Sequence, residues 1–86
     1  MECHWSILPG STEGGSFASI RQAVAHARQY VAEKLRIKHM VYYDPESEMT
    51  LNIHEGAAAG MGRVLVSWTG KYKNFVKLDW FYLAGS

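Results

Sequence analysis

The sequence predicts an α+β fold, a four- or five-stranded antiparallel sheet with one amphipathic helix packed on one face. Apolar residues recur at three- and four-residue intervals between Phe17 and Lys38, namely at Ile20, Val24, Ala27, Val31 and Leu35, with Ala23 and Tyr30 widening the stripe. The segments on either side are rich in strand-forming residues. A helix with one apolar stripe must cover something, and these strands supply the surface.

The first strand is expected at Cys3 to Leu8 and ends at Pro9–Gly10. Ser11 to Gly15 is interpreted as a loop of small residues. Ser16 suits the N-cap of the helix, and Ser19 with Gln22 offers a capping-box spacing one turn later.

After the helix, the pattern predicts a hairpin with strands at His39 to Asp44 and Glu48 to His54, around the turn Asp44–Pro45–Glu46–Ser47. The face expected under the helix carries Met40, Tyr42, Met49, Leu51 and Ile53. The opposite face carries His39, Val41, Tyr43, Glu48, Thr50, Asn52 and His54. A register shift of one residue would invert the faces of one strand.

Glu55 to Gly62 is interpreted as a mobile loop, and Arg63 to Trp68 as the next strand. Gly70–Lys71 fits a tight type II′ turn into the last element. Asn74 to Leu83 is predicted to be a strand, because Val76, Leu78, Trp80 and Tyr82 alternate. A helix capped by Asn74 and stopped at Gly85 is the alternative. The predicted order along the chain is β-α-β-β-β-β.

Composition bounds the class of protein. The 86 residues predict one small domain spanning 1–86, and the 48% apolar fraction argues against disorder. Cys3 is the only cysteine, so no internal disulfide can form, and a reducing compartment is the simpler expectation. No signal peptide is recognised, and no window approaches the roughly 20 apolar residues of a membrane span. We therefore expect a cytoplasmic protein that does not interact with membranes.

No constellation for catalysis or metal binding is recognised. His39 and His54 would share a sheet face, but a zinc site usually takes three or four converging ligands, so no metal and no cofactor are expected. Cys3 and His4 are adjacent and would point to opposite faces of a strand. The glycines from Gly56 to Gly62 lack the Gly-Lys-Ser/Thr ending of a phosphate loop. The sequence therefore predicts a protein that is not an enzyme.

Binding residues are expected in two places. The segment Lys71–Lys77 combines Lys71, Lys73 and Lys77 with Tyr72, and an uncovered sheet face would expose rings such as Tyr43. Arg21 and Arg28 on the outer face of the helix are a second option.

These features predict a small protein-binding module, of the kind that inhibits or modulates a larger macromolecule. Homodimerisation through the open face or an edge strand fits equally well. The alternative is a nucleic-acid-binding domain in which Arg21, Arg28, Lys71 and Lys73 contact phosphates while Tyr72 stacks on a base. The net charge of only +1 weighs against this alternative.

Overall fold

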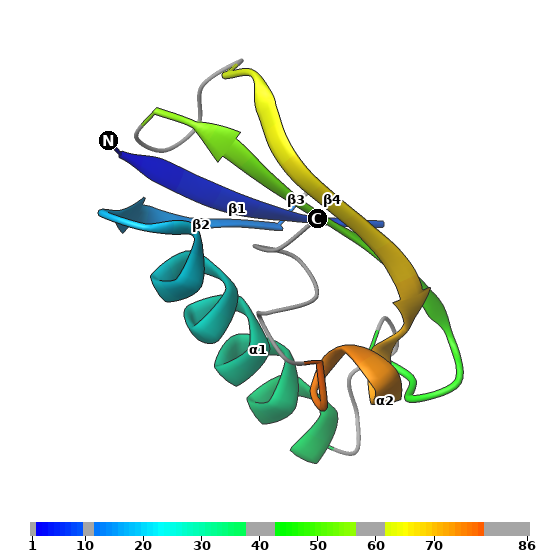
Figure 1. The fold of residues 1–86 in the computed structure, drawn as a ribbon. Coiled ribbons are helices and arrows are strands. Elements are labelled where there is room, and N and C mark those ends of the chain that lie inside the picture. The colour runs from blue at the N-terminus through cyan, green and yellow to red at the C-terminus, as the bar shows by residue number, and fades with distance from the viewer. Residues whose placement is uncertain (1, 10–11, 38–42, 57–61, 79–86) are drawn as a thin grey trace.

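The computed structural model describes residues 2–9, 12–37, 43–56 and 62–78. These residues form β1 (Cys3–Leu8), β2 (Thr12–Phe17), α1 (Ile20–Arg36), β3 (Glu48–Glu55), β4 (Val64–Lys71) and α2 (Tyr72–Phe75). The four strands make one antiparallel sheet in the order β2-β1-β3-β4. Both helices lie on the same side of it (Figure 1). The predicted α+β class, with a four-stranded antiparallel sheet and one long helix, is confirmed.

Helix α1 follows the predicted apolar stripe. Its N-cap is Ser19, whose Oγ accepts a hydrogen bond from the Gln22 backbone N–H at 3.2 Å, while Gln22 Oε1 accepts one from the Ala18 N–H at 3.2 Å. The cap is thus the later of the two expected positions, and Ser16 belongs to β2. The buried residues of the helix all come from the predicted stripe: Ala23, Val24, Ala27 and Val31.

The prediction of a loop from Ser11 to Gly15 is wrong, because Thr12–Phe17 forms the edge strand β2. Ser11 itself lies outside the described residues. Gly14 pairs with Trp5 of β1, and a Cβ at Gly14 would overlap the indole ring. Glycine at position 14 favoured the prediction of a loop, but in the structure its lack of a side chain allows β2 to pack against the Trp5 ring.

The predicted hairpin is right in its turn and its second strand only. Asp44 Oδ1 accepts from the Glu46 N–H at 2.8 Å, and the Ser47 N–H donates to Asp44 O at 3.0 Å, so the turn is present. Tyr43 and Asp44, however, are not in a strand, and residues 39–42 lie outside the described residues. The neighbours of β3 are instead β1 and β4, which occupy both of its edges.

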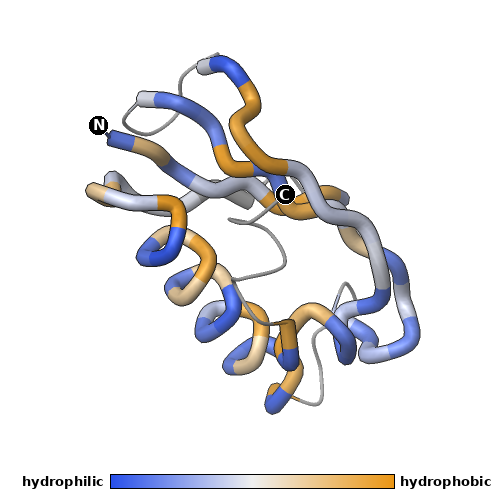
Figure 2. The backbone as a smooth tube through the Cα atoms, in the orientation of Figure 1, coloured by the Kyte–Doolittle hydropathy of each residue, from blue (hydrophilic) through white to orange (hydrophobic). Residues whose placement is uncertain are grey.

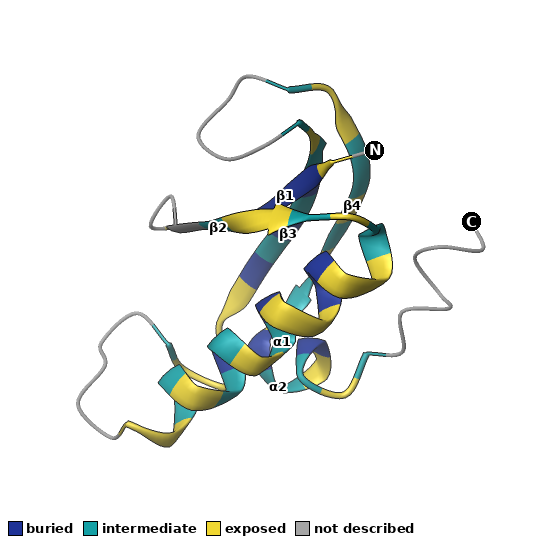
Figure 3. Cartoon of the chain, turned by 90° about the vertical axis from the view of Figure 1, so that its left-hand side faces the viewer, coloured by how far each residue is buried: buried dark blue, intermediate teal, exposed yellow. Residues whose placement is uncertain are grey.

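The faces of β3 follow the prediction despite the different neighbours. Met49, Leu51 and Ile53 are buried under the helices, whereas Glu48, Thr50, Asn52 and His54 lie on the opposite face and are partly or fully exposed. Figure 3 shows the same alternation along the strand. The period of two was enough to orient this strand without knowing what it pairs with.

The end of the chain differs from the prediction. Gly70 and Lys71 continue β4 rather than forming a type II′ turn, and Asn74 lies inside the short helix α2. The strand predicted from Asn74 is therefore wrong as far as Leu78, and residues 79–83 lie outside the described residues. Tyr72 and Phe75, three residues apart, are the buried residues of α2.

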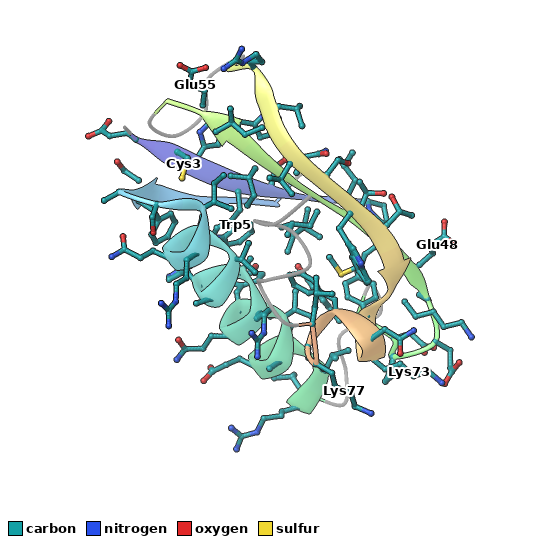
Figure 4. The ribbon with its side chains drawn as sticks, viewed as in Figure 1. Cys3, Trp5, Glu48, Glu55, Lys73 and Lys77 are labelled. Carbon is teal, nitrogen blue, oxygen red and sulfur yellow. The ribbon has the colours of Figure 1, made fainter. Side chains whose placement is uncertain are left out.

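The core between the sheet and the helices is built around Trp5, which is 1% exposed. Its Nε1–H donates to Nδ1 of His26 on α1 at 3.1 Å. Six rings form a continuous row of contacts with centroids 5.0 to 6.3 Å apart, in the order Phe17, His26, Trp5, Tyr30, Tyr43 and Tyr72. Figure 4 shows Trp5 between the sheet and α1, with Glu48 pointing away from this layer.

We expect Gly14→Ala to destabilise the protein by about 1–3 kcal/mol, the usual cost of forcing an extra methyl into a packed site. The new Cβ would overlap Cε2, Cζ2 and Nε1 of Trp5. Urea denaturation monitored by circular dichroism measures the change. The control is the same substitution in a Trp5→Phe background, where the smaller ring reduces the cost. An equal cost in both backgrounds would contradict the close packing of Gly14 on Trp5.

Candidate functional site

Two surfaces carry the residues with functional potential. One is the face of the sheet opposite the helices, and the other is the corner where β4 runs into α2. Two histidines at one end of the sheet and a cavity beside α1 complete the set of candidates.

Opposite the helices, one part of the sheet surface is hydrophilic. We call this part the polar face, and it consists of Glu48, Thr50, Asn52, Ser67, Thr69 and Lys71. Two exposed apolar residues on the same side border it: Leu8, which pairs with Thr50, and Val64, which pairs with His54. Three cross-strand pairs bring these residues together: Glu48 with Lys71, Thr50 with Thr69, and Asn52 with Ser67. The two threonine hydroxyls are hydrogen-bonded at 3.0 Å. Figure 2 shows that β3 changes repeatedly between apolar and polar residues, whereas β4 passes from one apolar stretch to residues of intermediate hydropathy and a hydrophilic end.

The composition of the polar face corrects one expectation. Rings such as Tyr43 were expected to form an apolar patch on this side of the sheet. Tyr43 packs instead on the helix side, between the rings of Tyr30 and Tyr72. No aromatic residue belongs to the polar face among the residues that the structure describes. Trp80, Phe81 and Tyr82 lie outside the described residues.

The corner between β4 and α2 is tied to the turn at residues 44–47. The Tyr72 N–H donates to Ser47 O at 3.0 Å and the Lys73 N–H to Pro45 O at 3.1 Å. Glu46 bridges the two lysines, with Oε2 at 3.2 Å from Lys71 Nζ and Oε1 at 2.7 Å from Lys73 Nζ. The hydrogen bonds from Lys73 and Lys71 hold the pKa of Glu46 below its usual range.

This geometry changes the interpretation of the Lys71–Lys77 segment. Tyr72 is 1% exposed, so its ring faces the core and offers no surface for a base to stack on. Burial, with a smaller effect of nearby Tyr43, raises the pKa of the Tyr72 hydroxyl. Lys71 and Lys73 are partly exposed, but both are ion-paired with the exposed carboxylate of Glu46. Lys77 follows α2 and is exposed. Figure 4 shows Lys73 and Lys77 at separate places along this end of the molecule.

The two arginines lie on α1, away from the polar face. Arg21 is exposed, and Arg28 is half-buried, with an Nε atom that is buried and has no hydrogen-bond partner. The structure therefore brings together Tyr43, Lys71, Tyr72 and Lys73 of the predicted set, while Arg21 and Arg28 belong to the helix layer.

Sequence reasoning missed a cluster of histidines. His4 of β1 stacks on His54 of β3, with ring centroids 5.0 Å apart. His4 Nδ1 lies 2.8 Å from Gly56 O, and His54 Nδ1 lies 3.2 Å from Gly62 O. The expected neighbour of His54 was His39, because the hairpin was assumed. Nothing local in the sequence indicates that residues so far apart, His4 and His54, are paired.

Ser6 completes this cluster, with Oγ 2.8 Å from His54 Nε2. Since a carbonyl oxygen only accepts, His54 Nδ1 donates to Gly62 O; in the tautomer with its only proton on Nδ1, Nε2 accepts from the serine hydroxyl. A serine, a base and a group that orients the base are also the elements of an activated nucleophile. Ser6, however, lies in the middle of β1, paired with both Glu13 and Asn52, and is 9% exposed. The surrounding backbone N–H groups are engaged in the sheet and cannot stabilise an oxyanion.

The remaining features carry no recognised chemistry. A cavity of about 420 Å³ lies beside α1 and is lined by His26, Gln29, Tyr30, Glu33, Lys34 and Ile37. Lys34 Nζ lies 5.2 Å from the centre of the Tyr30 ring there. Among the described residues, no three histidine, cysteine or acidic side chains gather in a way that could hold a metal ion. Neither helix of the described residues has the length and apolar character of a membrane span.

No family model matches the chain, and no curated protein or solved structure matches it at a significant level.

We expect Lys73→Met to raise the pKa of Glu46 toward its usual value, and Lys71→Met to raise it less, because Lys73 makes the shorter hydrogen bond. A lowered pKa in the folded state means that this ion-paired corner is favoured above that pKa and weakens as the pH falls through it. Acid titration of the Glu46 side-chain carbon by NMR measures the pKa. Lys77→Met is the matched control and leaves Glu46 unchanged. An equal rise in all three variants would contradict the specific bridge.

Proposed function

We propose that this chain is a small, non-enzymatic protein-binding module that modulates a larger protein by docking through its polar face. The observation that carries the proposal is that both helices cover the same side of the sheet and leave Thr50, Asn52, Ser67 and Thr69 without a described layer above them. A sheet surface is rigid, so little conformational entropy is lost when a partner binds.

The hydrophilic character of this face fits a partner that binds and dissociates. Interfaces of non-obligate complexes are about as apolar as the rest of a protein surface, and they use hydrogen bonds for orientation. The hydroxyls and the amide of the polar face supply donors and acceptors at regular cross-strand spacing. Glu48 adds a negative charge at one end, beside Lys71, whose positive charge is shared with Glu46.

The nucleic-acid alternative has less support. Binding of single strands relies on aromatic rings for stacking and on cations for the phosphates. Tyr72 is buried, and Lys71 and Lys73 already contact the carboxylate of Glu46. The polar face itself carries one lysine and one glutamate, so it presents no concentrated positive charge to a phosphate backbone.

A cytoplasmic location is part of the proposal. Cys3 is a free thiol that is buried in the core, where its Sγ contacts Phe17 O at 3.6 Å. Desolvation raises the pKa of this thiol, so it stays protonated and unreactive. A reducing compartment is consistent with a fold that uses its cysteine as a small apolar residue.

The test places a benzophenone amino acid at Asn52, in the polar face, or at Ala25, which is exposed on the outside of α1. Irradiation in the cells that produce the protein should give a discrete adduct of higher mass from position 52 and none from position 25. The adduct should resist nuclease and disappear when Thr69 is also changed to Arg. No adduct from position 52, or equal adducts from both positions, would contradict docking through the polar face. An adduct that nuclease removes would favour the nucleic-acid alternative.

A further inference from the structure

The two edges of the sheet differ in how well they are protected. The edge strand β2 contains Glu13, Gly14 and Gly15 and has an irregular register against β1. Charge, glycine and irregularity are the usual protection against pairing with another strand. The other edge, β4, has the sequence VLVSWTGK, with no proline and with its only charge at the last residue. Val64 of this strand is 48% exposed.

The hydrogen bonds of β4 fix which of its backbone groups face outward. The Tyr72 N–H donates to Ser47 O at 3.0 Å, just outside the pair of Glu48 with Lys71. A hydrogen bond in that position identifies Glu48–Lys71 as a non-hydrogen-bonded pair of the antiparallel ladder.

The two kinds of pair alternate along an antiparallel ladder, so the next non-hydrogen-bonded pairs are Thr50–Thr69 and Asn52–Ser67. The N–H and C=O groups of Ser67 and Thr69 therefore point away from β3, toward the edge. Among the described residues β4 pairs with β3 alone, so these donors and acceptors have no strand partner there. Their spacing fits the backbone of another extended strand.

We propose that the β4 edge is a dimerisation surface, on which a second copy of this chain pairs antiparallel to β4 with Trp68 at the two-fold axis. In this register Ser67 faces Thr69 of the second copy and Thr69 faces Ser67 of the second copy. Each of these two pairs exchanges two backbone hydrogen bonds, so all the outward groups of both residues are satisfied. The two sheets become one continuous sheet, and this inference does not depend on the proposed function of the polar face.

Charge and shape favour this register over the one with Ser67 on the axis. With Trp68 on the axis, Lys71 faces Leu65 of the second copy, so no like charges meet. With Ser67 on the axis, Arg63 of each copy would instead face Lys71 of the other, so two pairs of like charges would meet. The β-bulge of β4, where Leu65 is the extra residue opposite Ile53 and His54, would also lie well inside the paired stretch.

Trp68 makes the axis favourable. A residue on the two-fold axis in a non-hydrogen-bonded pair meets its own copy at the closest cross-strand distance, and aromatic pairs there stabilise a sheet. Trp68 is half-buried against Phe75, with ring centroids 5.6 Å apart, so one side of its ring is already fixed. The net charge of +1 leaves little repulsion between two copies.

The decisive variant is Ser67→Pro. Proline removes the outward N–H of Ser67, which makes no hydrogen bond to β3, and proline is tolerated on edge strands for this reason. Ser67→Ala is the matched control, because it keeps the N–H and removes only the hydroxyl. Thermal unfolding of both variants reports whether the monomer stays folded.

Sedimentation equilibrium of the purified full chain measures the association. Because one strand pair buries less surface than a standard interface, we expect a wild-type dissociation constant in the range of roughly 10 μM to 1 mM. Ser67→Ala should leave it within about a factor of two. Ser67→Pro removes two hydrogen bonds per dimer and should weaken association about tenfold or more.

Isotope-filtered NMR of mixed labelled and unlabelled wild-type protein provides a readout that needs no variant. The proposal expects nuclear Overhauser contacts between the Trp68 indoles of two copies. A wild-type protein that is monomeric at about 1 mM, a folded Ser67→Pro that associates as the wild type does, or dimer contacts that omit Trp68 would each overturn it.

Discussion

The hydrogen bond from the Trp5 indole to His26 is the interaction on which the arrangement of this molecule depends. It joins the central strand β1 to the middle of α1, across the layer where most of the core lies. A buried indole N–H without an acceptor costs about 1–3 kcal/mol, so this hydrogen bond favours the helix position in which Nδ1 of His26 can accept. The size of the indole also explains why the strand on its other side has glycine at position 14.

The polar face follows from this one-sided packing. With α1 held over β2 and β1, and α2 following directly from β4 on the same side, the buried apolar residues of the sheet face the helices. The other side carries hydroxyl, amide and charged groups of β3 and β4, bordered by the exposed Leu8 and Val64. Binding by such a surface would depend on hydrogen-bond geometry rather than on apolar area, in line with the reversible binding that we propose.

Local patterns in the sequence were sufficient for the helix and for the faces of β3, because burial imposes periods of 3.6 and 2 whatever the neighbouring strand is. They failed where the structure depends on contacts distant in sequence. The pairing of β3 with β1, and with it the contact of His4 with His54, leaves no local signal. Gly14 was interpreted as part of a loop because its close approach to Trp5 is a tertiary constraint. Tyr72 and Phe75 have helical spacing, and that signal was outweighed by the alternation further along the chain.

The most direct measurement is the scalar coupling across the hydrogen bond between Trp5 Nε1 and His26 Nδ1, detected by NMR of uniformly ¹⁵N-labelled protein. A cross-peak that links the two nitrogens, together with slow solvent exchange of that indole proton, is the expected result. An indole proton that exchanges as fast as an exposed one, with no coupling to any histidine nitrogen, would mean that α1 is not held where the core and the polar face both require it.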